Sequence, residues 1–119
     1  MDERDRLREQ TARNVAGLEH EQRGEADAAI TLYEANVAEG FPGDWPYSRL
    51  VLLYGKRGQP DEVVRVLERA VAVFAALPRA QPDRGPRLRV FRQRLKEARQ
   101  ALRPGRARRK PEAPDPPAR

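Results

Sequence analysis

The side chains that could carry out catalytic or metal chemistry are few and scattered in this chain of 119 residues. It has one histidine, His20, and no cysteine, so the residues that most often bind zinc or act as nucleophiles are nearly missing. Its one serine, Ser48, follows no nucleophile-elbow pattern, and the sequence has no glycine-rich phosphate loop. Glu19 and Glu21 lie near the end of a predicted helix, where carboxylates are usually solvated. We therefore predict that the protein is not an enzyme and has no catalytic residue, cofactor or metal site.

Charge is the second property with chemical consequences, because it is divided unevenly along the chain. The formal net charge is +6, but residues 1–78 carry −4 and residues 79–119 carry +10. A basic segment of this kind can bind nucleic-acid phosphates in a salt-dependent way without reading the base sequence. It can equally be a solvated helix surface, and residues 104–119 contain no aromatic side chain that could stack on bases.

The spacing of apolar residues predicts the helices that position these groups. Apolar or small side chains recur at steps of three and four residues, as in the stripe of Leu7, Thr11, Val15 and Leu18. Glycines and prolines separate such stretches from one another. The pattern predicts helices over residues 2–22, 25–39, 46–57, 60–74 and 87–102.

Two segments are predicted to be non-helical. Residues 75–86 contain Pro78, Pro82, Gly85 and Pro86, which break helices, so we expect an irregular connection there. Residues 103–119 hold five of the eleven prolines and almost no apolar residue, which is too little to offset the entropy of ordering. We therefore predict one domain over residues 1–102, followed by a disordered basic tail over residues 103–119.

The chain resembles itself at a shift of 34 residues, which is a period typical of helix-turn-helix repeats. The matched pairs are Gly24 with Gly58, Asp27 with Asp61, Ala29 with Val63, Ile30 with Val64, Tyr33 with Leu67 and Glu34 with Glu68. The second copy resembles the tetratricopeptide repeat signature at Tyr47, Leu50, Val51, Tyr54, Gly58, Val63, Leu67 and Ala70. The first copy resembles it at Gly24, Ala29 and Tyr33.

This resemblance implies an all-α fold of two antiparallel helix-turn-helix repeats, stacked as in an α-α superhelix. Tyr33, Tyr54 and Leu67 are expected to be buried between the helices, and Gly17 is expected to let two helices approach closely. Arrays of this kind usually need about three units or a cap. The predicted helix over residues 87–102 has an apolar seam and is expected to be the cap, either in the same molecule or through a homodimer.

The resemblance also implies a groove that binds a partner and is lined by the first helix of each repeat. The residues at these positions are Asn14, Leu18, Glu21, Ser48, Arg49, Leu52 and Lys56. Trp45, the only tryptophan, is an eighth candidate and lies in the predicted loop between the repeats. Such grooves often clamp a terminal carboxylate with asparagines and lysines, but Leu18 and Arg49 stand where asparagines would be needed. Solvated helix faces, with Trp45 plugging the end of a helix pair, are the alternative interpretation.

These observations favour a non-enzymatic scaffold or adaptor that binds a protein or peptide of unknown identity. The alternative is a nucleic-acid-associated protein that binds phosphate through the basic C-terminal helix and tail. The N-terminus lacks the apolar core of a signal peptide, and no run approaches the roughly 18 to 20 apolar residues that cross a bilayer. Arginine outnumbers lysine 21 to 3, as in GC-rich bacterial genomes. We therefore expect a cytoplasmic, bacterial protein with no membrane partner.

Overall fold

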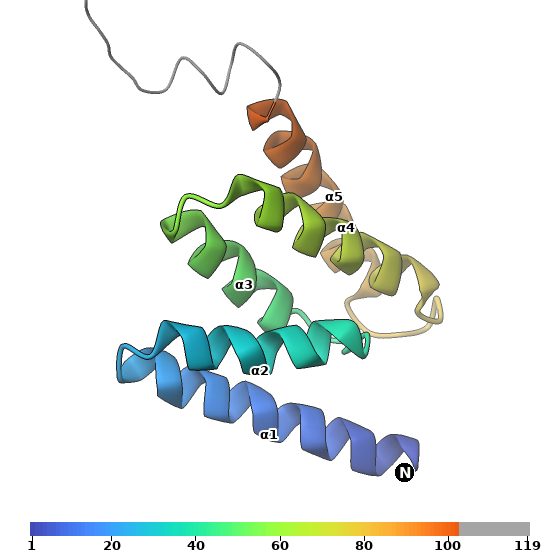
Figure 1. Cartoon of the computed structure of the whole chain (residues 1–119). Coiled ribbons are helices and arrows are strands. Elements are labelled where there is room, and N and C mark those ends of the chain that lie inside the picture. Colours follow the sequence, from blue (N-terminus) through green and yellow to red (C-terminus); the bar gives the residue numbers. More distant parts are fainter. Residues whose placement is uncertain (103–119) are drawn as a thin grey trace, which may run out of the picture.

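The computed structural model describes residues 1–102, which form five helices and no strand (Figure 1). The helices are α1 (Glu3–Gln22), α2 (Ala26–Ala38), α3 (Trp45–Lys56), α4 (Pro60–Ala76) and α5 (Arg84–Ala101). This confirms the predicted all-α fold class. The predicted disordered tail lies outside the described residues.

The ends of the helices follow from local chemistry. The side chain of Asp2 accepts a hydrogen bond from the backbone N–H of Asp5 at 2.8 Å, which is the usual way an aspartate starts a helix, here α1. Gly24 and Gly58 follow α1 and α3 with φ angles of 76° and 67°, in the left-handed region that favours glycine. The same type of helix ending is therefore found twice in the structure, 34 residues apart, as the repeat in the sequence predicts.

Consecutive helices pack against each other, so that α1 with α2 and α3 with α4 form two antiparallel hairpins stacked through α2 and α3 (Figure 1). Tyr33, Tyr54 and Leu67 are buried, as predicted. The centre of the second half is aromatic, because the rings of Tyr47, Phe74 and Phe91 lie with centroids 5.2 to 6.0 Å apart. These three rings join α3, α4 and α5 into one core.

Helix α1 contacts α2 through small and polar residues, and its apolar stripe lies largely outside this contact. Leu7 and Val15 are 45% and 53% exposed, whereas the buried residues of α1 are Gln10 and Gly17. A Cβ atom placed on Gly17 would lie 2.5 Å from Cε1 of Tyr33, so α1 and α2 approach more closely than a side chain at this position would allow. The predicted role of Gly17 is confirmed. The apolar stripe correctly predicted a helix over these residues, but close approach and polar contacts, not this stripe, bring α1 and α2 together.

Two predicted boundaries are corrected by the structure. Trp45 is the first residue of α3 and does not lie in a loop. The connection predicted to be irregular over residues 75–86 is shorter, because α4 continues to Ala76 and α5 begins at Arg84. Pro86 therefore lies in the first turn of α5, where its missing N–H costs no helical hydrogen bond.

The start of α5 is tied back to the end of α4. The guanidinium of Arg84 donates to the carbonyl oxygens of Leu77 and Ala75, each at 2.9 Å. These contacts satisfy carbonyls that the end of α4 leaves without a helical partner. They explain how a short connection can turn the chain back at this point.

The helix predicted to be a cap packs on α4 within the same chain (Figure 1). Its seam of Leu88, Phe91 and Leu95 is buried, and Val66 of α4 has no exposed surface. The apolar face of α4 is thus covered in the same molecule, an arrangement that the sequence left open. The predicted homodimer through α5 stays a prediction.

Within residues 1–102, no helix combines the length and the apolar composition that crossing a membrane requires.

The first prediction concerns the repeat core. Leu67→Ala should lower the free energy of unfolding by about 2 to 5 kcal/mol, because it removes a side chain that is 1% exposed and leaves a cavity. Leu52→Ala, at a position that is 41% exposed, is the matched control and should cost less than about 1 kcal/mol. Urea unfolding followed by circular dichroism measures both. Equal losses for the two variants would contradict the assigned core.

The second prediction concerns α5. Replacing Phe91 and Leu95 together by serine should unfold the domain, because two buried apolar side chains of the cap would be lost from a fold of small total stability. The control, Val90→Ser with Arg89→Ser, changes exposed residues of the same helix. Circular dichroism and sedimentation would detect the loss. Wild-type helicity, melting temperature and mass in the first variant would show that α5 does not stabilise the domain.

Candidate partner-binding face

Side-chain contacts place α1, α3 and α5 next to one another on one side of the molecule. The guanidinium of Arg49 in α3 donates from Nε to Oε2 of Glu21 in α1 at 3.0 Å. Nη1 of Arg94 in α5 lies 3.3 Å from Oγ of Ser48 in α3. Nη1 of Arg87 pairs with Oδ2 of Asp44, just before α3, at 3.0 Å. We name this side the α1/α3/α5 face and define it by Asn14, Val15, Leu18, Trp45, Ser48, Leu52, Lys56, Val90 and Arg94.

The eight residues predicted to bind a partner all lie on α1 and α3. On α3 they follow a spacing of three and four residues, which places them on one stripe of the helix, opposite the buried Leu50 and Tyr54. Trp45, Leu52 and Lys56 are exposed, and the others are partly buried.

Four side chains, three apolar and one amide, line a shallow depression between α1 and α3 on the face. It has a volume of about 260 Å³ and is lined by Asn14, Val15, Leu18 and Trp45. The sequence predicted three of these residues as partner-binding candidates and missed Val15, which it used only as evidence for the helix. The guanidinium of Arg49 lies 5.6 Å from the centroid of the Trp45 ring, and this cation–π contact helps to hold the indole in place.

Glu21 and Arg49 interact with each other, so they do not present free charges to a partner. The Glu21 side chain is 10% exposed and accepts a hydrogen bond from the Tyr33 hydroxyl at 2.7 Å in addition to those from Arg49. The hydrogen bond from Arg49 lowers the pKa of Glu21, against an opposing effect of burial. Burial, followed by the hydrogen bond to Glu21, raises the pKa of Tyr33 to about 12. These groups therefore fix the relative positions of three helices beneath the face.

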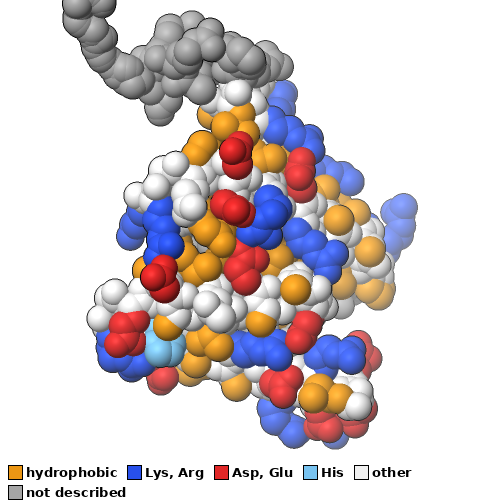
Figure 2. All heavy atoms as spheres, in the orientation of Figure 1, with side chains coloured by type: hydrophobic (Ala, Val, Ile, Leu, Met, Phe, Trp, Pro, Cys, Tyr) orange, Lys and Arg blue, Asp and Glu red, His pale blue; other side chains and the backbone are white. Residues whose placement is uncertain are grey.

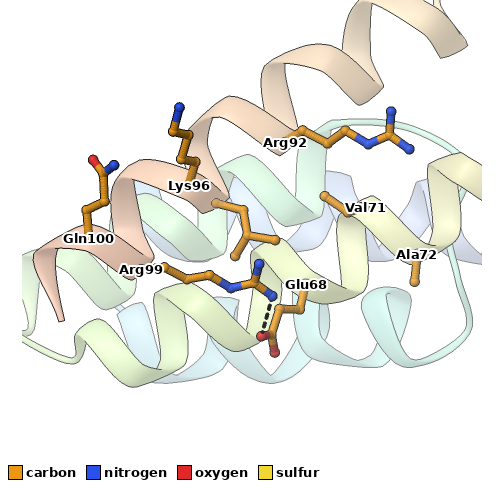
Figure 3. A pocket seen from close by; sticks show the side chains of 8 residues that line it. Glu68, Val71, Ala72, Arg92, Lys96, Arg99 and Gln100 are labelled. Carbon is orange, nitrogen blue, oxygen red and sulfur yellow. Dashed lines mark hydrogen bonds and ion pairs between the residues drawn. The ribbon is translucent and has the colours of Figure 1, made fainter. Parts of the chain in front are cut away.

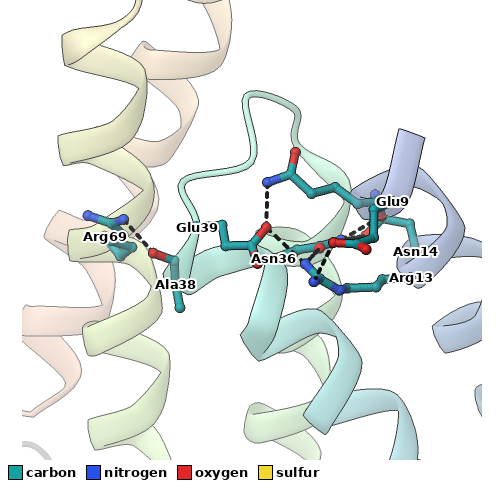
Figure 4. Close-up of polar contacts among 8 residues, drawn as sticks. Glu9, Arg13, Asn14, Asn36, Ala38, Glu39 and Arg69 are labelled. Atoms are coloured by element: carbon teal, nitrogen blue, oxygen red, sulfur yellow. Dashed lines mark hydrogen bonds and ion pairs between the residues drawn. The ribbon is translucent and has the colours of Figure 1, made fainter. Parts of the chain in front are cut away.

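Asn14 belongs to a second polar cluster, which joins α1 to α2 (Figure 4). Asn36, which is fully buried, donates to the side-chain oxygen of Asn14 at 2.8 Å and to the carbonyl oxygen of Gln10 at 2.7 Å. Nη1 of Arg13 donates to Oδ1 of Asn36 at 3.0 Å and pairs with Glu39 at 2.9 Å. The apolar spacing did not predict this cluster, although an asparagine between Tyr33 and Val37 on the buried side of α2 was a signal for it.

The face collects most of the exposed large apolar side chains of the described residues. There are six of them, and Val15, Trp45, Leu52 and Val90 belong to the face, at 40% to 53% exposure. The other two, Met1 and Leu7, lie near the N-terminus. Val90 was missed because it adjoins the buried Phe91 and lies off the apolar seam of α5. The face is therefore more apolar than the eight predicted residues indicated.

Comparison with known proteins gives no relative for this arrangement, since the chain matches no family model, no curated protein and no solved structure. Within residues 1–102, no group of three or more histidine or acidic side chains could hold a metal ion.

The third prediction concerns pH. Because the pKa of Glu21 is lowered in the folded state, its carboxylate contributes stability above its ordinary pKa of 4.5, and this contribution is lost as the pH falls. Glu21→Gln should cost about 1.5 to 3 kcal/mol at pH 7, as hydrogen bonds to charged groups do, and the difference from wild type should shrink below pH 4. Urea unfolding across pH 3 to 8 measures it. The exposed Glu19→Gln is the control, and an equal effect of both changes would refute the assignment.

Proposed function

We propose that this chain is a non-enzymatic scaffold of the tetratricopeptide type that binds a protein segment across the α1/α3/α5 face. The observation that carries the proposal is the concentration of exposed apolar side chains there, with Trp45 and Leu52 on α3 between Val15 on α1 and Val90 on α5. Exposed apolar side chains that gather on one surface mark interaction sites, and tryptophan is enriched among the residues that dominate binding energy. The repeat register and the helix order support the same class.

The face combines an open apolar depression with polar side chains, as sites that bind a protein segment do. The depression beside Trp45 is apolar and open, so it can accept an apolar side chain of a partner. Ser48, Arg94 and Lys56 add polar groups further along the face, which can fix the orientation of a bound backbone. Because the Glu21 and Arg49 charges are already paired, apolar contacts around Trp45 should supply most of the affinity.

A second candidate function, phosphate binding by the basic end, rests on the composition of α5. Seven of its residues are Arg or Lys and only one, Glu97, is acidic. Four of the seven are engaged with protein groups: Arg84, Arg87, Arg94 and Arg99. Arg89, Arg92 and Lys96 are therefore left for a phosphate backbone. We favour the protein-binding function because four of the seven basic residues of α5 already form hydrogen bonds or ion pairs within the fold.

The fourth prediction tests the face. Trp45→Ala combined with Leu52→Ser should abolish retention of a protein partner by the immobilised full chain, with the helical circular dichroism spectrum unchanged, because both residues lie at the surface, outside the buried core. The control, Leu7→Ser, removes an exposed apolar side chain outside the face and should retain the partner. Affinity isolation followed by mass spectrometry measures this.

The same experiment separates the two candidate functions through salt and nuclease. A protein that is retained after nuclease treatment, and lost only when the face is changed, supports the scaffold. If every retained protein disappears with nuclease or in high salt, and the Trp45 and Leu52 changes have no effect, phosphate binding is the function.

A further inference from the structure

Helix α4 fills the groove between α2 and α3. Arg69 of α4 donates to the carbonyl oxygens of Val37 at 3.1 Å and Ala38 at 3.0 Å, at the end of α2. Arg65 of α4 pairs with Glu34 in the same groove. Val37 is 2% exposed as a result of this packing and that of its other neighbours.

The corresponding groove, one repeat further along, is open. A shift of 34 residues carries Glu34, Val37 and Ala38 onto Glu68, Val71 and Ala72 of α4. These three residues line an open groove of about 560 Å³ between α4 and α5, and Val71 is only partly buried (Figure 3). The remaining lining residues come from α5: Arg92, Leu95, Lys96, Arg99 and Gln100. The groove thus stands one repeat on from the one that α4 occupies, and in the described residues no helix lies in it.

The charge of the open groove determines what can bind there. Arg92, Lys96 and Arg99 are spaced by four and three residues, so they form one stripe along α5. Arg99 pairs with Glu68 at 2.9 Å, and no carboxylate of residues 1–102 forms an ion pair with the other two. Like charges four residues apart on a helix repel, and a bound anion would remove that cost. Figure 2 shows Lys and Arg side chains at the edge of the molecule that α5 forms, and others over the remaining helices.

We propose that the groove between α4 and α5 binds an acidic amphipathic helix from another protein. Apolar side chains of that helix would cover Val71 and Leu95, and its carboxylates would pair with Arg92 and Lys96. This site is separate from the α1/α3/α5 face, because Arg92 and Lys96 lie on the side of α5 opposite Val90 and Arg94.

No segment of the chain outside the packed array has the required charge. Helix α1 carries charges of both signs, and α2 and α4 are already packed in the array. Residues 103–119 contain six Lys and Arg against two Asp and Glu, so they match the sign of the groove wall. Charge complementarity therefore points to a different protein.

The test uses the full chain and a synthetic helix of about 16 residues, long enough to be partly helical alone, with leucines three and four residues apart and glutamates beside them. A control peptide has glutamine in place of every glutamate. Calorimetry should show the acidic peptide binding at least about tenfold more tightly than the control. Methyl NMR signals of Val71 and Leu95 should shift on titration.

The matched variants change the same amount of charge. Arg92→Glu with Lys96→Glu should weaken binding of the acidic peptide by at least about tenfold, while circular dichroism stays that of wild type because both residues are exposed. Arg4→Glu with Arg79→Glu, at exposed positions outside the groove, should bind the peptide as wild type does.

Four results would overturn the proposal. The first is equal binding of the acidic and glutamine peptides, and the second is unchanged peptide binding after the Arg92 and Lys96 changes. The third is a wild-type dimer in sedimentation that those changes dissociate, which would assign the groove to a second copy. The fourth is an oligothymidine probe that binds more tightly than the acidic peptide and loses more affinity in the Arg92 and Lys96 variant, which would assign the groove to phosphate.

The groove and the α1/α3/α5 face can be tested separately. Trp45→Ala, which changes the face, should leave binding of the acidic peptide unchanged, so the two proposals can fail separately.

Discussion

The carboxylate of Glu21 is the point at which three helices of this protein meet. It belongs to α1, accepts a hydrogen bond from the hydroxyl of Tyr33 in α2, and pairs with the guanidinium of Arg49 in α3. Helix α1 buries only Gln10 and Gly17, so apolar area alone does little to fix its direction. A largely buried ion pair with a further hydrogen bond has the directionality that apolar packing lacks. The alignment of α1 with α3, and with it the first half of the α1/α3/α5 face, depends on this junction.

The second half of the molecule is organised by apolar packing. The rings of Tyr47, Phe74 and Phe91 come from three different helices and share one centre. Burial of the Tyr47 side chain raises the pKa of its hydroxyl, which donates to the carbonyl oxygen of Phe41 at 2.8 Å and so holds the connection between α2 and α3. Helix α5 thereby completes the core and ends the array without a sixth helix in the described residues.

Ending an array with a single helix leaves two surfaces of different chemistry on either side of that helix. Toward α3, the exposed side chains are apolar and the nearby charges of Glu21 and Arg49 are neutralised by pairing. Toward α4, the groove has an apolar floor and a basic wall. One surface thus suits contacts dominated by desolvation of apolar groups, and the other suits contacts that depend on charge and therefore on salt.

The number and approximate extent of the helices, the repeat register and the burial of Tyr33, Tyr54 and Leu67 could all be predicted from the sequence. These properties are local or periodic: Gly24 and Gly58 mark helix ends through their own backbone freedom, and Tyr33 and Leu67 occupy equivalent positions 34 residues apart. Spacing along one helix could not determine which stripe faces its neighbour, because that depends on the side chains of both helices. The stripe containing Leu7 and Val15 faces solvent since Gly17 admits Tyr33 and Asn36 bonds to α1. Three other features could not be predicted, because each depends on distances between residues far apart in the chain. Glu21 and Arg49 neutralise each other, α5 covers α4 in the same molecule, and Val71 is left partly exposed while its counterpart Val37 is buried.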